Sequence, residues 1–479
     1  MLRWIFKLSG PVPGAGRGPE GWRPAFYCLL PILAWLSWWL AFYPGLMNAD
    51  SLTAWGEAMR GVFNETQTGF LPIAYAWLMK LWDSPGLIGL IQIGSAALAL
   101  WYFLRVLSGL GAPAWMLGGL ALYFAFFPMI GASLITLIKD VPAGILSLFL
   151  FSFTLRIIES NGQWLQSRIH GLVLACTLAL LCLVRLEGWV PAAAFMAGLG
   201  WYYRGLWRQI GRVLLLSATL VFLVRGPLYA FYGVKRTAYE QTVRMQCAQL
   251  AVIYNNHGRL APRQTEFMYQ LAPAEVWTQW YSPYVQNGVV FSPRFNLERA
   301  YEQRRELTRV WREAVQANWG LLLQSRVKMG AIVWRILEPR GGYTYAVHVV
   351  AVPAGIDDNT AGLHLTHPLP AWEQTLRKVL QLTSPRACNW FFYRPAFQLY
   401  VIGLSVALLV VRFQRWPALL LAVPLVAQAL LIGLLAIGQE SRFLFADFLI
   451  MPCLLAYAVV LILNRHRPGA GSPHSEINV

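Results

Sequence analysis

The stretch PAFYCLLPILAWLSWWLAFY (Pro24–Tyr43) is predominantly apolar, and Met47-Asn48-Ala49-Asp50-Ser51 follows it after three further residues. Twenty residues in a helix reach about 30 Å, which is the thickness of the hydrocarbon core of a bilayer. A carboxylate where such a span meets water is costly to keep unless it is used. We therefore interpret the rest of the chain as a frame that holds Asp50 at one membrane face.

The composition supports this interpretation. The chain has 479 residues, of which 57% are hydrophobic and 13% charged, with a mean hydropathy of +0.48. A soluble protein has about a quarter of its residues charged. The net charge of +17 is explained by arginines on cytoplasmic loops, which set orientation and contact anionic lipid. No nucleic-acid-binding motif is present, so nucleic acid is not an expected partner.

Hydropathy predicts an all-α polytopic membrane protein with about ten transmembrane helices. The expected spans are Pro24–Tyr43, Leu87–Val106, Ala114–Ile130, Val141–Leu155, Gly171–Val184, Gly188–Tyr203, Val213–Tyr232, Ala396–Val411, Trp416–Ile437 and Phe443–Leu463. With the N-terminus inside, fourteen lysines and arginines lie at inner ends and five on short outer loops. We therefore expect a cytoplasmic (inner) membrane protein with both termini inside.

These spans divide the chain into five parts. Residues 1–23 form a cytoplasmic segment that lacks the features of a cleavable signal peptide. Residues 24–233 form a seven-span membrane domain with a first outer loop at 44–86, and residues 396–463 form a three-span domain. Between them, residues 234–395 form an outer, mostly helical soluble region of about 160 residues. Residues 464–479 form a cytoplasmic tail.

Two apolar stretches are too short or too charged to span, and we expect them to lie on the outer membrane surface. They are Leu71–Trp82 in the first outer loop and the amphipathic segment Trp319–Leu337. The outer region also contains Cys247 and Cys388, which could form a disulfide in an oxidising compartment or remain as two free thiols.

With this topology, unusual ionisable residues collect at the outer face. They are Asp50, Glu57, Lys139, Asp140, Arg185, Glu187, Arg225, Glu440 and Arg442. The four cations are suited to a lipid phosphate, because guanidinium forks match phosphate oxygens. Asp50 is suited to act as general base on an acceptor hydroxyl. The chain has no CxxC motif or His pair at metal spacing, and the first outer loop has no DxD pair, so we expect neither a metal nor a cofactor.

Each of these residues also has a structural interpretation. Asp50 could cap the helix that begins at Ser51, and Lys139 and Asp140 could pair or cap the fourth span. Arg185 and Glu187 could form a structural ion pair, and Arg225 could extend its side chain to the membrane surface. Glu440 and Arg442 could end a helix, and Glu57, seven residues after Asp50, is a weaker candidate.

Short motifs resemble a known superfamily. The pattern Tyr43-Pro44-Gly45 followed by Asn48-Ala49-Asp50-Ser51-Leu52 looks like the first outer loop of GT-C integral-membrane glycosyltransferases, which include protein mannosyltransferases and aminoarabinose transferases. Lys139-Asp140 and Glu440-Ser441-Arg442-Phe443 are similar to motifs of a poorly characterised bacterial branch. One feature departs from that branch: Pro72 is present, but the histidine that often precedes it in relatives is Leu71 here.

The resemblance implies a function. The chain would transfer a sugar from a polyprenyl-phosphate-linked donor to an extracytoplasmic glycan, lipid or protein, with inversion at the anomeric carbon. Asp50 would be the catalytic aspartate, and Lys139 and Arg442 would hold the donor phosphate. The alternatives are a transporter or flippase, or a non-catalytic assembly protein, for lipid-linked glycans. An O-antigen polymerase or ligase would use the same type of donor.

Overall fold

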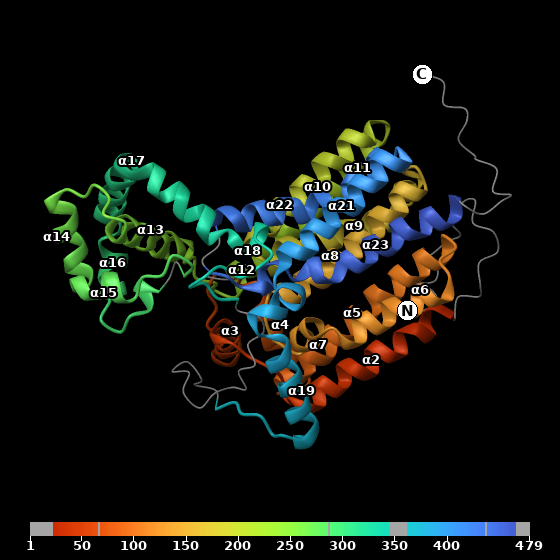
Figure 1. Cartoon of the computed structure of the whole chain (residues 1–479), viewed down its shortest axis with the longest axis horizontal. Coiled ribbons are helices and arrows are strands. Elements are labelled where there is room, and N and C mark those ends of the chain that lie inside the picture. The colour runs from red at the N-terminus through yellow and green to blue at the C-terminus, as the bar shows by residue number, and fades with distance from the viewer. Residues whose placement is uncertain (1–22, 66–67, 286–287, 345–361, 436–437, 466–479) are drawn as a thin grey trace.

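The computed structural model describes residues 23–65, 68–285, 288–344, 362–435 and 438–465. The described residues are helical, and only isolated β-bridges occur among them. Most of the predicted segments 1–23 and 464–479 lie outside these residues. Figure 1 shows a bundle of long helices, from which a lobe formed by α13–α17 projects to one side.

Among the residues that the structure describes, seven helices are long and apolar enough to cross a membrane, or eight if the bent pair α6–α7 is counted as one span. The seven stretches are Pro24–Ala41, Pro85–Gly109, Asp140–Glu159, Arg204–Phe231, Pro395–Phe413, Trp416–Leu435 and Ser441–Arg465. The corresponding elements are α2 (Arg23–Ala41), α5 (Pro85–Gly109), α8 (Asp140–Glu159), α11 (Trp207–Leu223) with its continuation into α12 (Tyr229–Phe231), α21 (Pro395–Phe413), α22 (Leu419–Leu435) and α23 (Phe445–Arg465). The chain is therefore an α-helical protein with the spans of a multi-pass membrane protein.

The expected ten spans are thus confirmed only in part. The third is the broken pair α6 (Ala114–Phe126) and α7 (Pro128–Leu134), bent by 60° at a proline. The fifth and sixth are α9 (Arg168–Val184) and α10 (Trp189–Tyr202), which have 17 and 14 residues. A helix of 14 residues extends only about 21 Å, less than the hydrocarbon thickness.

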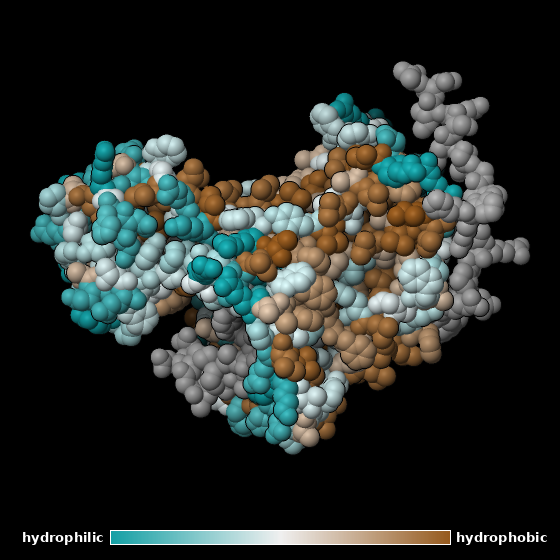
Figure 2. All heavy atoms as spheres, in the orientation of Figure 1, coloured by the Kyte–Doolittle hydropathy of each residue, from teal (hydrophilic) through white to brown (hydrophobic). Residues whose placement is uncertain are grey.

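The expected outer region divides into two parts. Five helices form a lobe with a hydrophobic core of its own around Cys247 and Trp277: α13 (Ala238–Asn255), α14 (Pro262–Leu271), α15 (Ala274–Gln279), α16 (Leu297–Glu302) and α17 (Arg304–Met329). By contrast, α19 (Pro370–Thr383) packs on α2 and α20 (Arg386–Phe392) packs on α21. In Figure 2, hydrophilic residues gather over the lobe and hydrophobic ones over much of the bundle, which suits a bundle surrounded by lipid.

The two expected surface stretches and the cysteines can also be placed. Leu71–Trp82 corresponds to α4 (Phe70–Met79), and Trp319–Leu337 corresponds to the end of α17 plus α18 (Ala331–Trp334). Cys247 is fully buried in the lobe, whereas Cys388 lies on α20. Both are free thiols, so the possible disulfide is not formed. The two cysteines do not pair because they lie in different parts of the structure. Cys247 lies in the core of the lobe, whereas Cys388 lies on α20, which packs on α21 of the bundle.

A fully buried arginine joins α18 to the bundle. Arg394, immediately before α21, donates hydrogen bonds to Ala331 O (2.8 Å), Arg335 O (3.1 Å) and Thr344 Oγ1 (2.9 Å). Burial lowers the pKa of Arg394 to about 10, which still leaves it charged at neutral pH. The side chain therefore holds the segment after α18 against the start of α21.

Replacing Arg394 by methionine should destabilise the protein, because buried carbonyl oxygens then lose their donor. Each such loss costs about 1–3 kcal/mol, so we expect a fall of several degrees in the melting temperature of the detergent-solubilised protein. Arg386→Met is the control, since Arg386 is exposed and donates one hydrogen bond, to Glu338 O at 2.7 Å. An equal effect of both variants would contradict this role of Arg394.

Candidate functional site

The candidate site begins at α3 (Ala49–Arg60). Its N-cap is Asn48, whose Oδ1 accepts hydrogen bonds from Ser51 N (2.8 Å) and Ser51 Oγ (2.9 Å). The capping interpretation of Asp50 is therefore wrong, because Asn48 occupies that position. The signal was present in the sequence, since Asn at the N-cap is as favourable as Asp. Asp50 lies in the first turn of α3, two residues after the N-cap.

A backbone bridge places this turn beside the start of α8. Leu46 N donates to Ile135 O (2.9 Å) and Leu137 N donates to Leu46 O (3.1 Å). The buried side chain of Gln92, on α5, donates to Leu134 O (3.0 Å) and Thr136 O (3.1 Å). These bonds fix the loop that leads to Lys139 and Asp140. Gln92 is not among the residues predicted for the site, although it is a polar residue inside an apolar span.

Arg442 connects Asp50 to this loop. Its Nη1 donates to Asp50 Oδ2 at 2.8 Å and lies 3.8 Å from Asp140 Oδ2, while its Nε bonds Glu440. Arg442 belongs to the turn Ser441–Leu444, which precedes α23. Asp50 and Arg442 are therefore in direct contact, although 392 residues separate them in the sequence. Such a contact is what a joint role of the two residues requires.

Arg185 completes the network from the turn between α9 and α10. Its Nη1 lies 3.0 Å from Asp140 Oδ1 and donates to Phe443 O at 3.0 Å, and its Nε lies 3.7 Å from Glu187 Oε2. Asp140 therefore faces one arginine on each oxygen and is fully buried. It pairs with these arginines and not with Lys139, and the N-cap position of α8 is Lys139, which makes no capping hydrogen bond.

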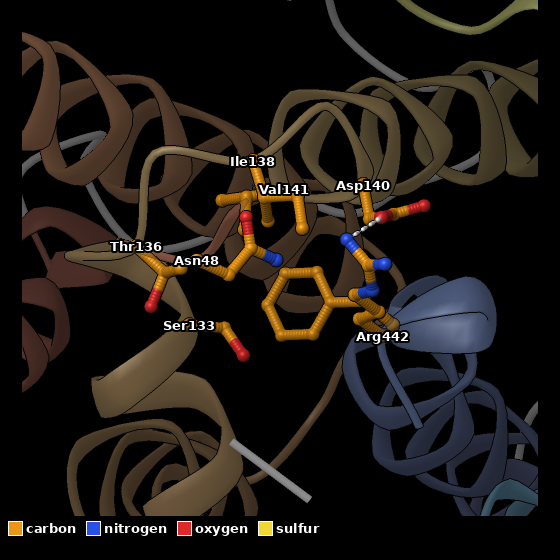
Figure 3. Close-up of a pocket in the computed structure, with 8 residues that line it drawn as sticks. Asn48, Ser133, Thr136, Ile138, Asp140, Val141 and Arg442 are labelled. Carbon is orange, nitrogen blue, oxygen red and sulfur yellow. Dashed lines mark ion pairs between the residues drawn. The ribbon is translucent and has the colours of Figure 1, made fainter. Parts of the chain in front are cut away.

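A pocket lies beside these charges. Its lining residues are Asn48, Ser133, Thr136, Ile138, Asp140, Val141, Arg442 and Phe445. Figure 3 shows Asp140 and Arg442 facing one another on one side of the pocket, with Ser133 and Thr136 on the other. Gly144 matters for this packing, because a Cβ there would lie 2.5 Å from the Phe445 ring. The pocket therefore combines an ion pair with hydroxyl groups and apolar walls.

The exposure of the charged groups differs within the network. The Asp50 side chain is 32% exposed, whereas that of Asp140 is 0% exposed and that of Arg442 is 15% exposed. Lys139 is half-buried, and in the described part of the chain its ammonium makes no hydrogen bond or ion pair. The Glu187 side chain is 41% exposed, so Asp50, Glu187 and Lys139 are the groups of the network most able to meet a ligand.

Two acids of the network have shifted pKa values. Burial raises the pKa of Glu440, and the adjacent Arg442 guanidinium only partly opposes this. Burial also acts to raise the pKa of Glu187, but the charges of Arg185 and Lys139 outweigh it and leave that pKa below the ordinary value. Glu187 is therefore ionised at neutral pH, and its charge offsets the two cations nearby.

Two predicted residues lie outside the network. Arg225, in a π-helical turn (Val224–Leu228), donates to Cys182 O at 2.9 Å, so it supports the end of α9. Glu57 is buried on α3 and accepts hydrogen bonds from the backbone and side chain of Asn64. Asp447, on α23, is a further buried acid that was not predicted; it is fully buried, and neither carboxyl oxygen is hydrogen-bonded within the described residues.

Glu57 should make stability depend on pH. Burial raises its pKa to about 7, although the bonds from Asn64 and the charge of Arg60 oppose the shift. The unfolded value is about 4.3, so the neutral acid stabilises the fold at low pH and this contribution is lost as pH rises from about 4 to about 7. The melting temperature of Glu57→Gln relative to wild type should therefore be higher at pH 8 than at pH 5, by several degrees.

The control is Glu266→Gln, because Glu266 is exposed on α14. Its melting temperature relative to wild type should be the same at both pH values. A pH-independent difference for Glu57→Gln would show that the Glu57 carboxyl keeps an ordinary pKa.

Comparisons with known proteins identified no relative of this chain. No protein-family model, no curated protein and no solved structure matches the chain significantly. The function is therefore argued from the arrangement of Asp50, Asp140, Arg185, Arg442 and Lys139 itself.

Proposed function

We propose that the chain is a membrane glycosyltransferase of the GT-C type, which moves a sugar from a polyprenyl-phosphate donor to a hydroxyl acceptor outside the cytoplasm. The observation that carries the proposal is the contact between Asp50 and Arg442 at 2.8 Å, with Lys139 directly before Asp140 at the start of α8. The ten-span topology with both termini inside, and the outer position of the site, are parts of this proposal.

The reaction needs two groups that this arrangement supplies. The acceptor hydroxyl must lose its proton as its oxygen forms a bond to the anomeric carbon, and Asp50, a partly exposed carboxylate in contact with Arg442, would accept that proton. The bond from the anomeric carbon to the donor phosphate oxygen breaks at the same time, and the phosphate leaves with the electron pair. Inversion follows if the two oxygens lie on opposite sides of the carbon.

The cations would have separate tasks. Lys139 would bind the leaving phosphate, because its ammonium is not engaged by another described side chain. Arg442 positions Asp50 through the 2.8 Å hydrogen bond, and its remaining contacts to Asp140 and Glu440 fix its own position. Arg185 acts one step further away, because it neutralises Asp140 and bonds Phe443 O.

The test is replacement of Asp50 by asparagine, which keeps the shape of the side chain but removes the base. Wild type and variant are expressed at equal levels in a deletion strain, and envelope glycans and lipid-linked sugars are profiled by mass spectrometry. We expect Asp50→Asn to lose one sugar modification by roughly a hundredfold or more, with accumulation of the lipid-linked donor.

Asp83→Asn is the matched control, because Asp83 is an exposed aspartate between α4 and α5. It should restore the modification fully. If Asp50→Asn restores it equally well, Asp50 is not a catalytic base, and a transporter or an assembly protein for lipid-linked glycans becomes the better explanation.

A further inference from the structure

The pocket beside the Asp50–Arg442 contact contains buried polar groups whose hydrogen-bonding capacity is not used. Asn48 is 3% exposed and Ser133 is 6% exposed, and the side chain of Asp140 is 0% exposed. All three residues line the pocket. A buried polar group without a partner is costly, so an occupant that satisfies these groups is favoured.

Asn48 presents a hydrogen-bond donor to the pocket. Its Oδ1 accepts hydrogen bonds from Ser51 N and Ser51 Oγ, at 2.8 and 2.9 Å, so the N–H groups of Nδ2 remain for another partner. Within the part of the chain that the structure describes, Nδ2 makes no hydrogen bond. Figure 3 shows the Asn48 nitrogen on the side of the residue that faces Arg442 across the pocket. An occupant of the pocket can therefore accept a hydrogen bond from this amide.

Ser133 and Asp140 add hydrogen-bond acceptors. The hydroxyl of Ser133 makes no hydrogen bond to another described residue. Neither carboxyl oxygen of Asp140 accepts a hydrogen bond from the described residues, although Arg185 and Arg442 lie 3.0 and 3.8 Å away. The two arginines thus balance the charge of Asp140 without satisfying its oxygens. An occupant that both donates and accepts hydrogen bonds would match the pocket.

The size and charge of the pocket restrict this occupant further. About 20 Å³ is available to a water-sized group, and holding one water molecule takes roughly 10–15 Å³. The opposite charges of Asp140 and Arg442 offset one another, so neither an ammonium nor a carboxylate group is favoured. A hydroxyl group is uncharged, has the size of a water molecule, and both donates and accepts hydrogen bonds. An acetamido group is larger than this space.

The location of the pocket beside the reacting groups indicates which hydroxyl it binds, and this step rests on the glycosyl transfer proposed above. Arg442 lines the pocket and donates to Asp50, the proposed base, at 2.8 Å. Asp140, which also lines it, directly follows Lys139, the proposed ligand of the phosphate. The anomeric carbon lies between the base and the phosphate during transfer. Among the hydroxyl groups of a hexose, the one on carbon 2 is next to that carbon.

We propose that Asn48, Ser133 and Asp140 bind the hydroxyl group on carbon 2 of the sugar that is transferred. The donor is therefore the polyprenyl phosphate of a sugar with a free hydroxyl at this position, and not of a 2-acetamido or 2-amino sugar. Discrimination follows because a donor without this hydroxyl leaves the buried polar groups of the pocket unpaired.

The test measures the binding of synthetic donors to the full-length protein in detergent, by microscale thermophoresis. The donors are polyprenyl phosphates that carry glucose, mannose, 2-deoxyglucose or N-acetylglucosamine. Glucose and mannose differ only in the orientation of the hydroxyl on carbon 2, and both give 2-deoxyglucose when it is removed. We expect the better of the glucose and mannose donors to bind roughly tenfold more tightly than the 2-deoxyglucose and N-acetylglucosamine donors.

Two variants assign this preference to the pocket. Ser133→Ala removes the hydroxyl, and Asn48→Asp keeps an N-cap acceptor for α3 but replaces the Nδ2 donor by an oxygen. Each variant should lose most of the roughly tenfold preference over the 2-deoxyglucose donor. Ser147→Ala is the control, because Ser147 lies on α8 outside the pocket and its hydroxyl donates to Ala143 O at 2.8 Å. It should keep the wild-type preference.

The outcomes separate a failure of this inference from a failure of the proposed function. If the 2-deoxyglucose or N-acetylglucosamine donor binds as tightly as the better hexose donor, the pocket does not bind this hydroxyl and is a site for water only, while the proposed function is unaffected. If no donor binds, the proposed function fails together with this inference. Loss of the preference in Ser147→Ala to the same extent as in Ser133→Ala would also refute the assignment.

Discussion

The structure around the candidate site depends on the neutralisation of Asp140. This carboxylate is fully buried at the start of a membrane-spanning helix, where an unpaired charge would cost many kcal/mol. Arg185 and Arg442 each approach one of its oxygens, at 3.0 and 3.8 Å. Since the two arginines come from different parts of the chain, this one requirement brings together α8, the α9–α10 turn and the turn before α23. The first outer loop then joins through Asp50.

Two aspartates that share Arg442 as a partner differ in their exposure to solvent. Arg442 contacts both, but Asp140 has no exposed side-chain surface, whereas Asp50 has about a third of its side chain exposed. Asp140 therefore holds the arginines in place, and Asp50 remains accessible to a ligand. The network thus combines a buried carboxylate, which positions the arginines, with an accessible one, and this arrangement agrees with the proposed role of Asp50.

The sequence alone determined the helical class and the membrane character, because both depend on long apolar runs whose cost in water is independent of packing. It also grouped five residues that the structure brings into contact, namely Asp50, Asp140, Arg185, Glu440 and Arg442. These residues could be recognised because ionisable groups near apolar runs are conspicuous whatever their partners. The number of helices long enough to span could not be counted from hydropathy, because the break at Pro128 and the short α10 depend on local geometry.

Only the tertiary structure decided which charges meet. Pairing depends on contacts between residues far apart in the chain, such as Asp50 with Arg442, and no local pattern encodes such a distance. The same limit explains why Glu57 and Arg225 were grouped with the site although they bond Asn64 and Cys182. It also explains why Gln92 and Arg394 went unnoticed, because their importance lies in their buried hydrogen-bond partners, and residue type does not reveal burial.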